Sequence, residues 1–226
     1  NNSLEQAQAD KKAHIAAKLF LKPGQRVLDI GCGWGGTALY LNRVADVDVL
    51  GITLSEEQLK IARQRAIDAG VADRVKFELI DYRSLTGTFD RIVSIGMFEH
   101  VGAKHFDEFF ATCRELLTDD GVGVLTVHGT EAFEGFRAGR RPGITQEQID
   151  SLHAAGPLEA ASFVFAPEVR PARRAPGVDP VWGLSFHSED YIRSHWGHFL
   201  SVQEIRPAAL NFRQDAVVVR RSTAAR

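Results

Sequence analysis

The fold of this chain is decided by residues 26–36, which read RVLDIGCGWGG. Residues 27–30 form a short apolar run with Asp29 set into it, a pattern typical of a buried strand in a parallel sheet. Three glycines follow at once in the G-x-G-x-x-G spacing, which permits a tight turn and close approach of the backbone to a ligand. Residues 37–44 can continue as a helix. The stretch therefore predicts a strand, a ligand-binding turn and a helix.

The ligand expected at this turn is S-adenosylmethionine rather than a dinucleotide. A dinucleotide site needs an acid about 20 residues farther on for the ribose hydroxyls, but the next predicted strand, residues 47–52, ends in Thr53. Asp29 precedes the glycines, where its carboxylate can accept hydrogen bonds from an ammonium group. S-adenosylmethionine carries an ammonium and no phosphate, so it fits better than NAD. The alternative is that Asp29 is a structural acid bonded to loop amides.

Composition narrows the class of protein. The chain has 226 residues, enough for one domain with a full core, and a formal net charge of −2, which gives no general attraction to nucleic acid. Its two cysteines, Cys32 and Cys113, lie in a predicted loop and a predicted helix and argue for a reducing compartment. The sequence shows no apolar run of membrane-spanning length and no secretory signal. A cytoplasmic protein is the expectation.

Strands and helices alternate along the first half of the chain. A helix over residues 3–22 comes first, with Ser3 as its N-cap. Strands are predicted at residues 27–30, 47–52, 75–80, 89–95 and 122–127. Ser55 and Gln58 are placed to form a capping box for the helix after the second strand. This alternation predicts a parallel sheet in a doubly wound α/β fold, with residues 1–226 as a single domain.

The pattern degrades after Gly129. Residues 130–185 are expected to be an insertion that covers the substrate, because long irregular connections in compact domains are usually functional or disordered. Within it only residues 145–154 are predicted as a clear helix, again with a capping box. A helix over 188–198 and an antiparallel pair of strands over 199–205 and 216–219 close the chain.

Four segments resemble a known family. They are LDIGCGWGG at 28–36, GITLS at 51–55, DYR at 81–83 and GMFEHVG at 96–102. Together they resemble the cyclopropane-fatty-acyl-phospholipid synthases and their mycolic acid relatives, which are S-adenosylmethionine-dependent class I methyltransferases. The resemblance runs from about residue 4 to residue 121. It implies a Rossmann-like class I methyltransferase fold, with a mostly parallel seven-stranded sheet and an antiparallel terminal strand.

The resemblance also implies which residues bind the cofactor. Asp29, Gly31 and Gly33 are expected to contact the methionine end of S-adenosylmethionine. Thr53 and Gln58 are expected at its ribose, and Asp81 and Tyr82 at its adenine. Aromatic faces can steady a sulfonium charge, and Trp34 and Phe98 are the candidates, with Phe98 also expected at the substrate. For Tyr82 the alternative is a packing residue that covers the sheet edge.

The catalytic residues implied by the resemblance are Glu99, His100 and His128. In the family, a substrate alkene attacks the sulfonium methyl, and the resulting carbocation loses a proton to bicarbonate held in the site. Glu99 matches the acid that helps to hold bicarbonate, and His100 follows it. The family's His-Thr-Ile-Gly segment is replaced here by TVHG at 126–129, so His128 lies farther along its strand. The alternative for Glu99 and His100 is a helix-capping acid beside a packed histidine.

The expected substrate is an unsaturated lipid or another apolar alkene, modified at carbon. The region after Gly129 diverges from the family and looks more like the closing part of small-molecule methyltransferases. The alternatives are therefore a methyltransferase of a polar small molecule, with His100, His128 or His187 as general base, and a non-catalytic cofactor-binding subunit. His187 and Tyr191 are expected to line the substrate pocket.

Two further groups of residues are open to more than one interpretation. His195 and His198 lie three apart, but no acidic or cysteine partner at ligand spacing accompanies them, so a surface helix is favoured over a metal site. Arginines cluster around residues 137–141 and 170–174. They are compatible with peripheral contact with lipid phosphates or with solvated loop charge. The sequence does not determine the oligomeric state.

Overall fold

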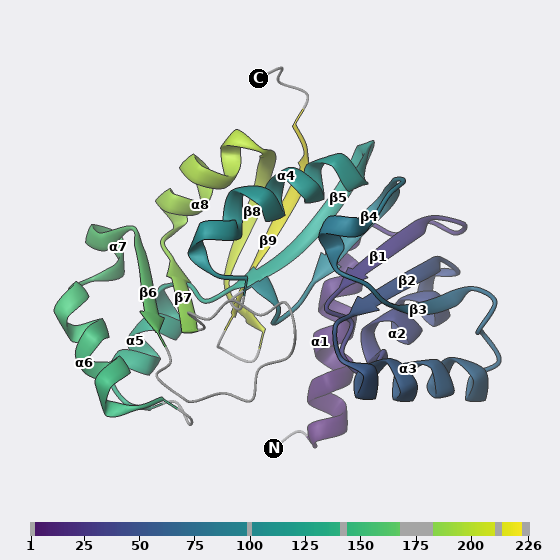
Figure 1. Cartoon of the computed structure of the whole chain (residues 1–226), viewed down its shortest axis with the longest axis horizontal. Coiled ribbons are helices and arrows are strands. Elements are labelled where there is room, and N and C mark those ends of the chain that lie inside the picture. The colour runs from purple at the N-terminus through teal and green to yellow at the C-terminus, as the bar shows by residue number, and fades with distance from the viewer. Residues whose placement is uncertain (1–2, 99–100, 141–143, 168–182, 211–213, 223–226) are drawn as a thin grey trace.

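The computed structural model describes residues 3–98, 101–140, 144–167, 183–210 and 214–222. Its centre is a seven-stranded sheet in the order β3-β2-β1-β4-β5-β9-β8 (Figure 1). The strands are β1 Arg26–Ile30, β2 Asp48–Thr53, β3 Val75–Leu79, β4 Phe89–Ser94, β5 Leu117–Val127, β8 Leu200–Leu210 and β9 Gln214–Arg221. Strands β1 to β5 pair in parallel, and β9 runs antiparallel to both β5 and β8. The predicted α/β fold with an antiparallel terminal strand is confirmed.

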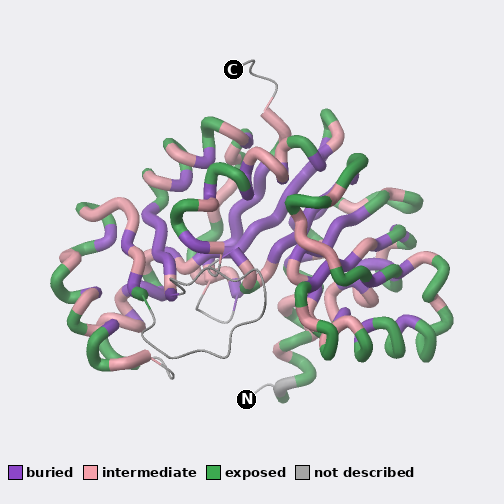
Figure 2. The backbone as a smooth tube through the Cα atoms, viewed as in Figure 1, coloured by how far each residue is buried: buried purple, intermediate pink, exposed green. Residues whose placement is uncertain are grey.

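Helices cover both faces of this sheet. One face carries α1 Leu4–Leu19, α2 Gly36–Ala45 and α3 Glu56–Asp68, whose buried residues share a core with Val27 and Val49. The other face carries α4 Phe106–Leu116 and α8 Glu189–His195, which pack on a second core with Leu28 and Ile30. Figure 2 shows the strands buried in the middle and the exposed residues on the outer sides of the helices. Short 3-10 turns occupy Tyr82–Ser84, Ala103–His105 and Trp196–His198.

Local signals placed most element starts correctly and some ends less well. Ser3 caps α1 by accepting a hydrogen bond from the Gln6 amide, but the helix ends at Leu19, before the predicted residue 22. It ends there because Phe20 adopts the left-handed conformation with φ of 49°. Strand β5 begins at Leu117 rather than at residue 122, with a shift of register against β4.

The stretch after Gly129 is more regular than the sequence suggests. It contains α5 Thr130–Arg137, α6 Gln146–Ala155, α7 Leu158–Ala161 and an antiparallel pair of strands, β6 Phe163–Pro167 and β7 Gly183–His187. These elements bury a small core of their own that includes Phe133, Leu152 and Phe186. Only α6 has the predicted capping box. Helix α5 was missed because its N-cap is Gly129, which provides no side-chain signal.

Within the described ranges, no helix is both long enough and apolar enough to cross a bilayer.

Candidate functional site

The glycine turn after β1 is held against the end of β2. The backbone amides of Gly31 and Cys32 both donate to the Ile52 carbonyl, at 3.0 and 2.9 Å. Gly31 has φ of 78° and Gly33 has φ of 54°, values that L side chains rarely adopt. A Cβ on Gly31 would lie 2.7 Å from Cγ of Met97, which follows β4. Both the backbone conformation and the space therefore require glycine at position 31.

We expect Gly31→Ala to destabilise the protein by about 1–3 kcal/mol, the usual cost of forcing extra volume into a packed site. The added methyl would displace Met97 and strain a left-handed residue. Chemical denaturation measures the loss. Gly24→Ala is the matched control, because Gly24 also has positive φ but no atom lies within 4 Å of its Cβ position. Equal losses in the two variants would show that backbone strain alone, and not the contact with Met97, sets the cost.

Asp29 presents a buried carboxylate at the start of the turn. The residue is only 2 % exposed, and its Oδ2 has no hydrogen-bond partner among the described residues. Burial raises the pKa of Asp29 from 3.8 to about 7, and the nearby Lys11 partly opposes that rise. No described loop amide donates to this carboxylate, so the structural alternative for Asp29 finds no support in the described residues. A buried acceptor without a partner is costly and favours a cationic ligand.

Thr53 and Gln58 contact one another at the end of β2. The Thr53 hydroxyl donates to Oε1 of Gln58 at 2.7 Å and accepts from the Ser55 amide at 3.1 Å. The Ser55 side chain accepts from the Gln58 amide, so only half of the predicted capping box forms. The Gln58 side chain bonds Thr53 instead of the Ser55 amide, because the Thr53 hydroxyl already occupies that amide. The pair lies at the same edge of the sheet as Asp29.

Asp81 and Tyr82 follow β3 at that edge but have partners within the protein. The carboxylate of Asp81 accepts from the Arg83 amide at 2.9 Å and from its guanidinium at 2.9 and 2.6 Å. These bonds lower the pKa of Asp81, so it is a firmly ionised acceptor. Tyr82 packs edge-on against Phe109 with ring centroids 5.3 Å apart. An adenine contact for either residue stays a prediction, and the packing alternative for Tyr82 agrees with this contact.

The two aromatic candidates for a sulfonium contact have opposite environments. Trp34 is 50 % exposed, and its carbonyl accepts a hydrogen bond from Arg65 at 2.9 Å. Phe98 is completely buried against the rings of Phe106, Phe109 and Phe110. Phe98 therefore forms part of an aromatic wall beyond β4, whereas Trp34 is half exposed.

His187 lies inside that aromatic wall. Its ring centroid is 5.4 Å from Phe98, 5.3 Å from Phe106 and 5.3 Å from Tyr191. The side chain is 1 % exposed, and neither ring nitrogen has a hydrogen-bond partner among the described residues. Burial lowers the pKa of His187 to about 3. A base this weak is a poor acceptor at neutral pH, so the general-base alternative for His187 is disfavoured, and a substrate-lining role for it stays a prediction.

We expect His187→Phe to stabilise the protein, because it replaces two nitrogens that have no partner in the described part of the chain by ring carbons in an aromatic environment. The gain is about 1–3 kcal/mol, the usual cost of a buried unpaired polar group. The gain in stability should grow as pH falls below 6.5. In that range the histidine of the unfolded wild type is protonated, whereas His187 in the folded protein, with its pKa near 3, stays neutral. Urea unfolding at pH 5 and pH 8 measures both effects. A destabilised variant at both pH values would mean that the imidazole makes a bond the cluster needs.

His128 links the end of β5 to the elements that follow it. Its carbonyl accepts from the His187 amide at 2.9 Å, and its ring lies 5.5 Å from the rings of Phe136 and Phe186. Glu99 and His100, the other two predicted catalytic residues, lie outside the described residues. Of the predicted arginine clusters, Arg137 forms an ion pair with Glu134 at 3.3 Å. His195 of the surface helix bonds Asp107 at 2.9 Å.

Asp215 is a buried acid that the sequence reasoning missed. It pairs with Val127 across β5 and β9, and its Oδ1 accepts from the Ala208 amide at 2.8 Å. It is 6 % exposed, and burial raises its pKa. A Cβ on Gly129 would overlap this carboxylate, which explains the glycine directly after His128. No local sequence signal marks Asp215, because the residues beside it in the fold, Val127 and Gly129, are far from it in the sequence.

The predicted cofactor residues converge because their strands are neighbours. Asp29 is the penultimate residue of β1, Thr53 ends β2 and Asp81 follows β3, and these parallel strands are adjacent in the sheet. The carboxyl ends of parallel strands share one edge, which is where open α/β sheets bind ligands. The described residues hold no group of three potential metal ligands.

Comparison with known proteins agrees with this geometry. The family model described as mycolic acid cyclopropane synthetase matches residues 1–141. Cyclopropane mycolic acid synthase 2 of Mycobacterium leprae is 40% identical over 233 residues, covering 96% of this chain and 71% of that protein. Cyclopropane-fatty-acyl-phospholipid synthase of Escherichia coli is 48% identical over 130 residues, covering 58% of this chain and 33% of that protein. The resemblance drawn from the four segments is confirmed.

A solved structure extends the similarity to the fold. Mycolic acid cyclopropane synthase CmaA1, complexed with SAH and CTAB, superimposes with a TM-score of 0.64 at 26% identity, covering 91% of this chain and 65% of that chain. Other relatives are much longer than this chain. The matched part covers 36% of a probable fatty acid methyltransferase of Pseudomonas putida and 33% of the E. coli synthase, so the chain spans about a third of their length. With the family model matching more than half of its residues, the chain belongs to the mycolic acid cyclopropane synthetase family.

Proposed function

We propose that this protein is an S-adenosylmethionine-dependent methyltransferase that transfers a methyl or methylene group to a carbon of an unsaturated lipid. The observation that carries the proposal is the buried Asp29 Oδ2, which has no partner among the described residues, at a glycine turn where β1 ends. Family membership supports it, since relatives are named cyclopropane-fatty-acyl-phospholipid synthase and cyclopropane mycolic acid synthase. A related structure was solved with SAH, the demethylated cofactor.

The residues at the sheet edge fit this cofactor. S-adenosylmethionine supplies an electrophilic methyl on a sulfonium. The Asp29 carboxylate can accept from its ammonium, and Gly31 and Gly33 let the backbone approach, with no atom within 4 Å of a Cβ position on Gly33. Thr53 and Gln58 offer hydroxyl and amide groups to the ribose. The exposed ring face of Trp34 is placed to meet positive charge.

The substrate side of the site is apolar. The wall that includes Phe98, Phe163 and Tyr191 joins the sheet to β6, since the Phe163 and Tyr191 rings stack with centroids 5.3 Å apart. We assign these residues to covering the substrate. Such a cover aligns the acceptor with the methyl and excludes water. An in-line displacement depends mainly on these two conditions. An apolar wall suits an acyl chain better than a polar small molecule.

For an alkene acceptor, the electron pair of the double bond forms the new bond to the methyl carbon while the sulfur keeps the pair of the broken bond. The cation that results must then lose a proton. Glu99, His100 and His128 are the residues assigned to that step, with bicarbonate as the acceptor implied by the resemblance. His187 is left out because its pKa near 3 makes it too weak a base.

Incubation with unsaturated phospholipid and methyl-labelled cofactor, followed by mass analysis of the acyl chains, tests this function. A gain of one methylene or methyl in the chain is the expected result. Glu99→Gln should abolish the gain while the cofactor still binds, and saturated phospholipid is the substrate control. If the label were transferred to polar small molecules while the lipid stayed unchanged, the substrate assignment would be overturned. Absence of cofactor binding would overturn the whole proposal.

A further inference from the structure

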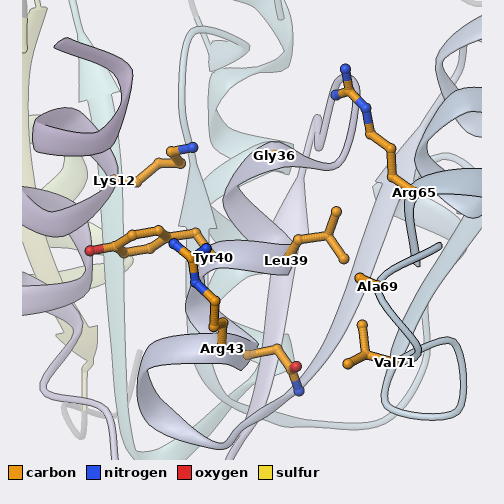
Figure 3. A pocket seen from close by; sticks show the side chains of 9 residues that line it. Lys12, Gly36, Leu39, Tyr40, Arg43, Arg65, Ala69 and Val71 are labelled. Atoms are coloured by element: carbon orange, nitrogen blue, oxygen red, sulfur yellow. The ribbon is translucent and has the colours of Figure 1, made fainter. Parts of the chain in front are cut away.

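A groove on the outer side of α2 is separate from the site at the strand ends. It is a cavity of about 400 Å³ between α1, α2 and α3 (Figure 3). Three cations, Lys12, Arg43 and Arg65, and the apolar side chains of Leu39, Ala69 and Val71 are among the residues that line it. We call it the α2 groove. Its volume is within the usual range of small-molecule sites.

The α2 groove faces away from the sheet. Ala38 and Leu41 are buried in the core under the sheet, and Asn42 is buried at the floor of the groove, whereas Leu39, Tyr40 and Arg43 line the groove and are less buried. The groove therefore backs onto the glycine turn without opening at the strand ends. Whatever binds in it does not occupy the place of the methyl donor.

The charge of the α2 groove is concentrated and positive. Lys12, Arg43 and Arg65 line it, and none of its lining residues is acidic. None of the three forms an ion pair with any carboxylate in the part of the chain that is described. The chain as a whole carries a net charge of −2, so this cluster is a local feature and not a general one.

Two of these cations are held together by one ring. The Lys12 ammonium lies 5.6 Å from the Tyr40 ring centroid, and the Arg43 guanidinium lies 5.4 Å from it. Arg65 lies on the other side of Leu39, where the Trp34 carbonyl fixes its guanidinium at 2.9 Å (Figure 3). Like charges gathered in this way repel one another, and an anion between them relieves the repulsion.

We propose that the α2 groove binds a phosphate group carried on an apolar body. Lys12 and Arg43 supply the charge-assisted donors at one end and Arg65 supplies them at the other, as phosphate recognition requires. Leu39, Ala69 and Val71 give the groove an apolar side. Inorganic phosphate would not cover this side, so a phosphate attached to an apolar group fits the groove better. The phosphate source is either the headgroup of an anionic lipid in a membrane or a soluble phosphate ester, and the experiment separates the two.

The experiment measures binding of the whole chain to defined probes. Co-sedimentation uses vesicles of phosphatidylglycerol and of phosphatidylcholine, and equilibrium dialysis uses glycerol 3-phosphate and inorganic phosphate. The test variant is Lys12→Gln/Arg43→Gln/Arg65→Gln. The control variant, Lys22→Gln/Lys76→Gln/Arg114→Gln, removes the same charge from positions outside the groove. Equal thermal midpoints of the two variants establish that both are folded.

With phosphatidylglycerol vesicles we expect at least tenfold weaker binding of the test variant, since each cation near an anionic surface contributes about fivefold. The control variant should lose far less. Vesicle binding that glycerol 3-phosphate does not displace assigns the site to a lipid headgroup, whereas glycerol 3-phosphate binding without vesicle binding assigns it to a soluble ester. Equal losses in both variants, or no binding of any probe, would overturn the proposal. The readout is binding, so its failure leaves the proposed methyl transfer untouched.

Discussion

Asp29→Asn is expected to abolish binding of S-adenosylmethionine while making the protein more stable above pH 7. The free protein holds this carboxyl in a buried position where its pKa is about 7 instead of 3.8. Removing the charge removes the acceptor for the ligand's ammonium. It also removes the cost of burying a carboxylate, which for a shift of about three pH units is on the order of 4 kcal/mol. Function and stability therefore oppose one another at this residue.

The pH dependence of this gain has a definite sign. Below about pH 4 the carboxyl is protonated in both the folded and the unfolded state, so Asp29 costs the fold nothing through ionisation. Between about pH 4 and pH 7 the unfolded state ionises while the folded state keeps its proton, and the free energy of unfolding falls as pH rises. Above pH 7 the penalty is complete and constant. The free energy of unfolding of Asp29→Asn should therefore exceed that of the wild type most at pH 8 and only slightly at pH 4.

Urea unfolding at these two pH values, with calorimetry for cofactor binding, tests the prediction. Asp73→Asn serves as the control, because Asp73 is an exposed acid away from the sheet edge and should change neither property. A variant that is less stable than wild type at pH 8 would show that Asp29 is ionised and has a stabilising partner. In that case the structural-acid alternative would be correct.

Binding of S-adenosylmethionine is expected to release a proton from Asp29 in a pH-dependent way. With a pKa near 7, about nine-tenths of the free protein carries this proton at pH 6 and about half carries it at pH 7. An ammonium placed against the carboxylate lowers its pKa and expels the proton. The apparent affinity should then rise about ninefold between pH 5 and pH 6 and about fivefold between pH 6 and pH 7. This is the second large effect that the buried carboxyl predicts.

Titration calorimetry in two buffers of different ionisation enthalpy counts the released protons. S-adenosylhomocysteine carries the same ammonium without the sulfonium, so it should release the same number. Methylthioadenosine lacks the amino acid portion and should release none. If all three ligands released equal numbers of protons, or the number did not change between pH 6 and pH 7.5, Asp29 would not be the group that meets the ammonium.

The strand, turn and helix that carry the candidate site were readable from the sequence because their signals are local. The apolar run before Gly31 and the spacing of the glycines follow from backbone sterics within one stretch, and the structure forms the strand, the turn and α2 there. The capping residues Ser3 and Thr145 act on amides a turn away, and both caps form as expected. Family motifs added the identity of the ligand edge, which periodicity alone does not provide.

Tertiary structure decided the features that depend on distant parts of the chain. Three features arise only once distant elements are packed: the close approach of Asp215 to Gly129, the burial of His187 among rings from several elements, and an Asp29 oxygen without a partner among the described residues. The half-formed box at Ser55 shows the same effect on a small scale, since Thr53 competes for the amide. The α2 groove likewise needs three helices at once. The sequence by itself determined the strand–turn–helix unit and its edge, because sterics and periodicity act between near neighbours, whereas charge burial and pocket shape were decided by packing between residues that the sequence keeps far apart.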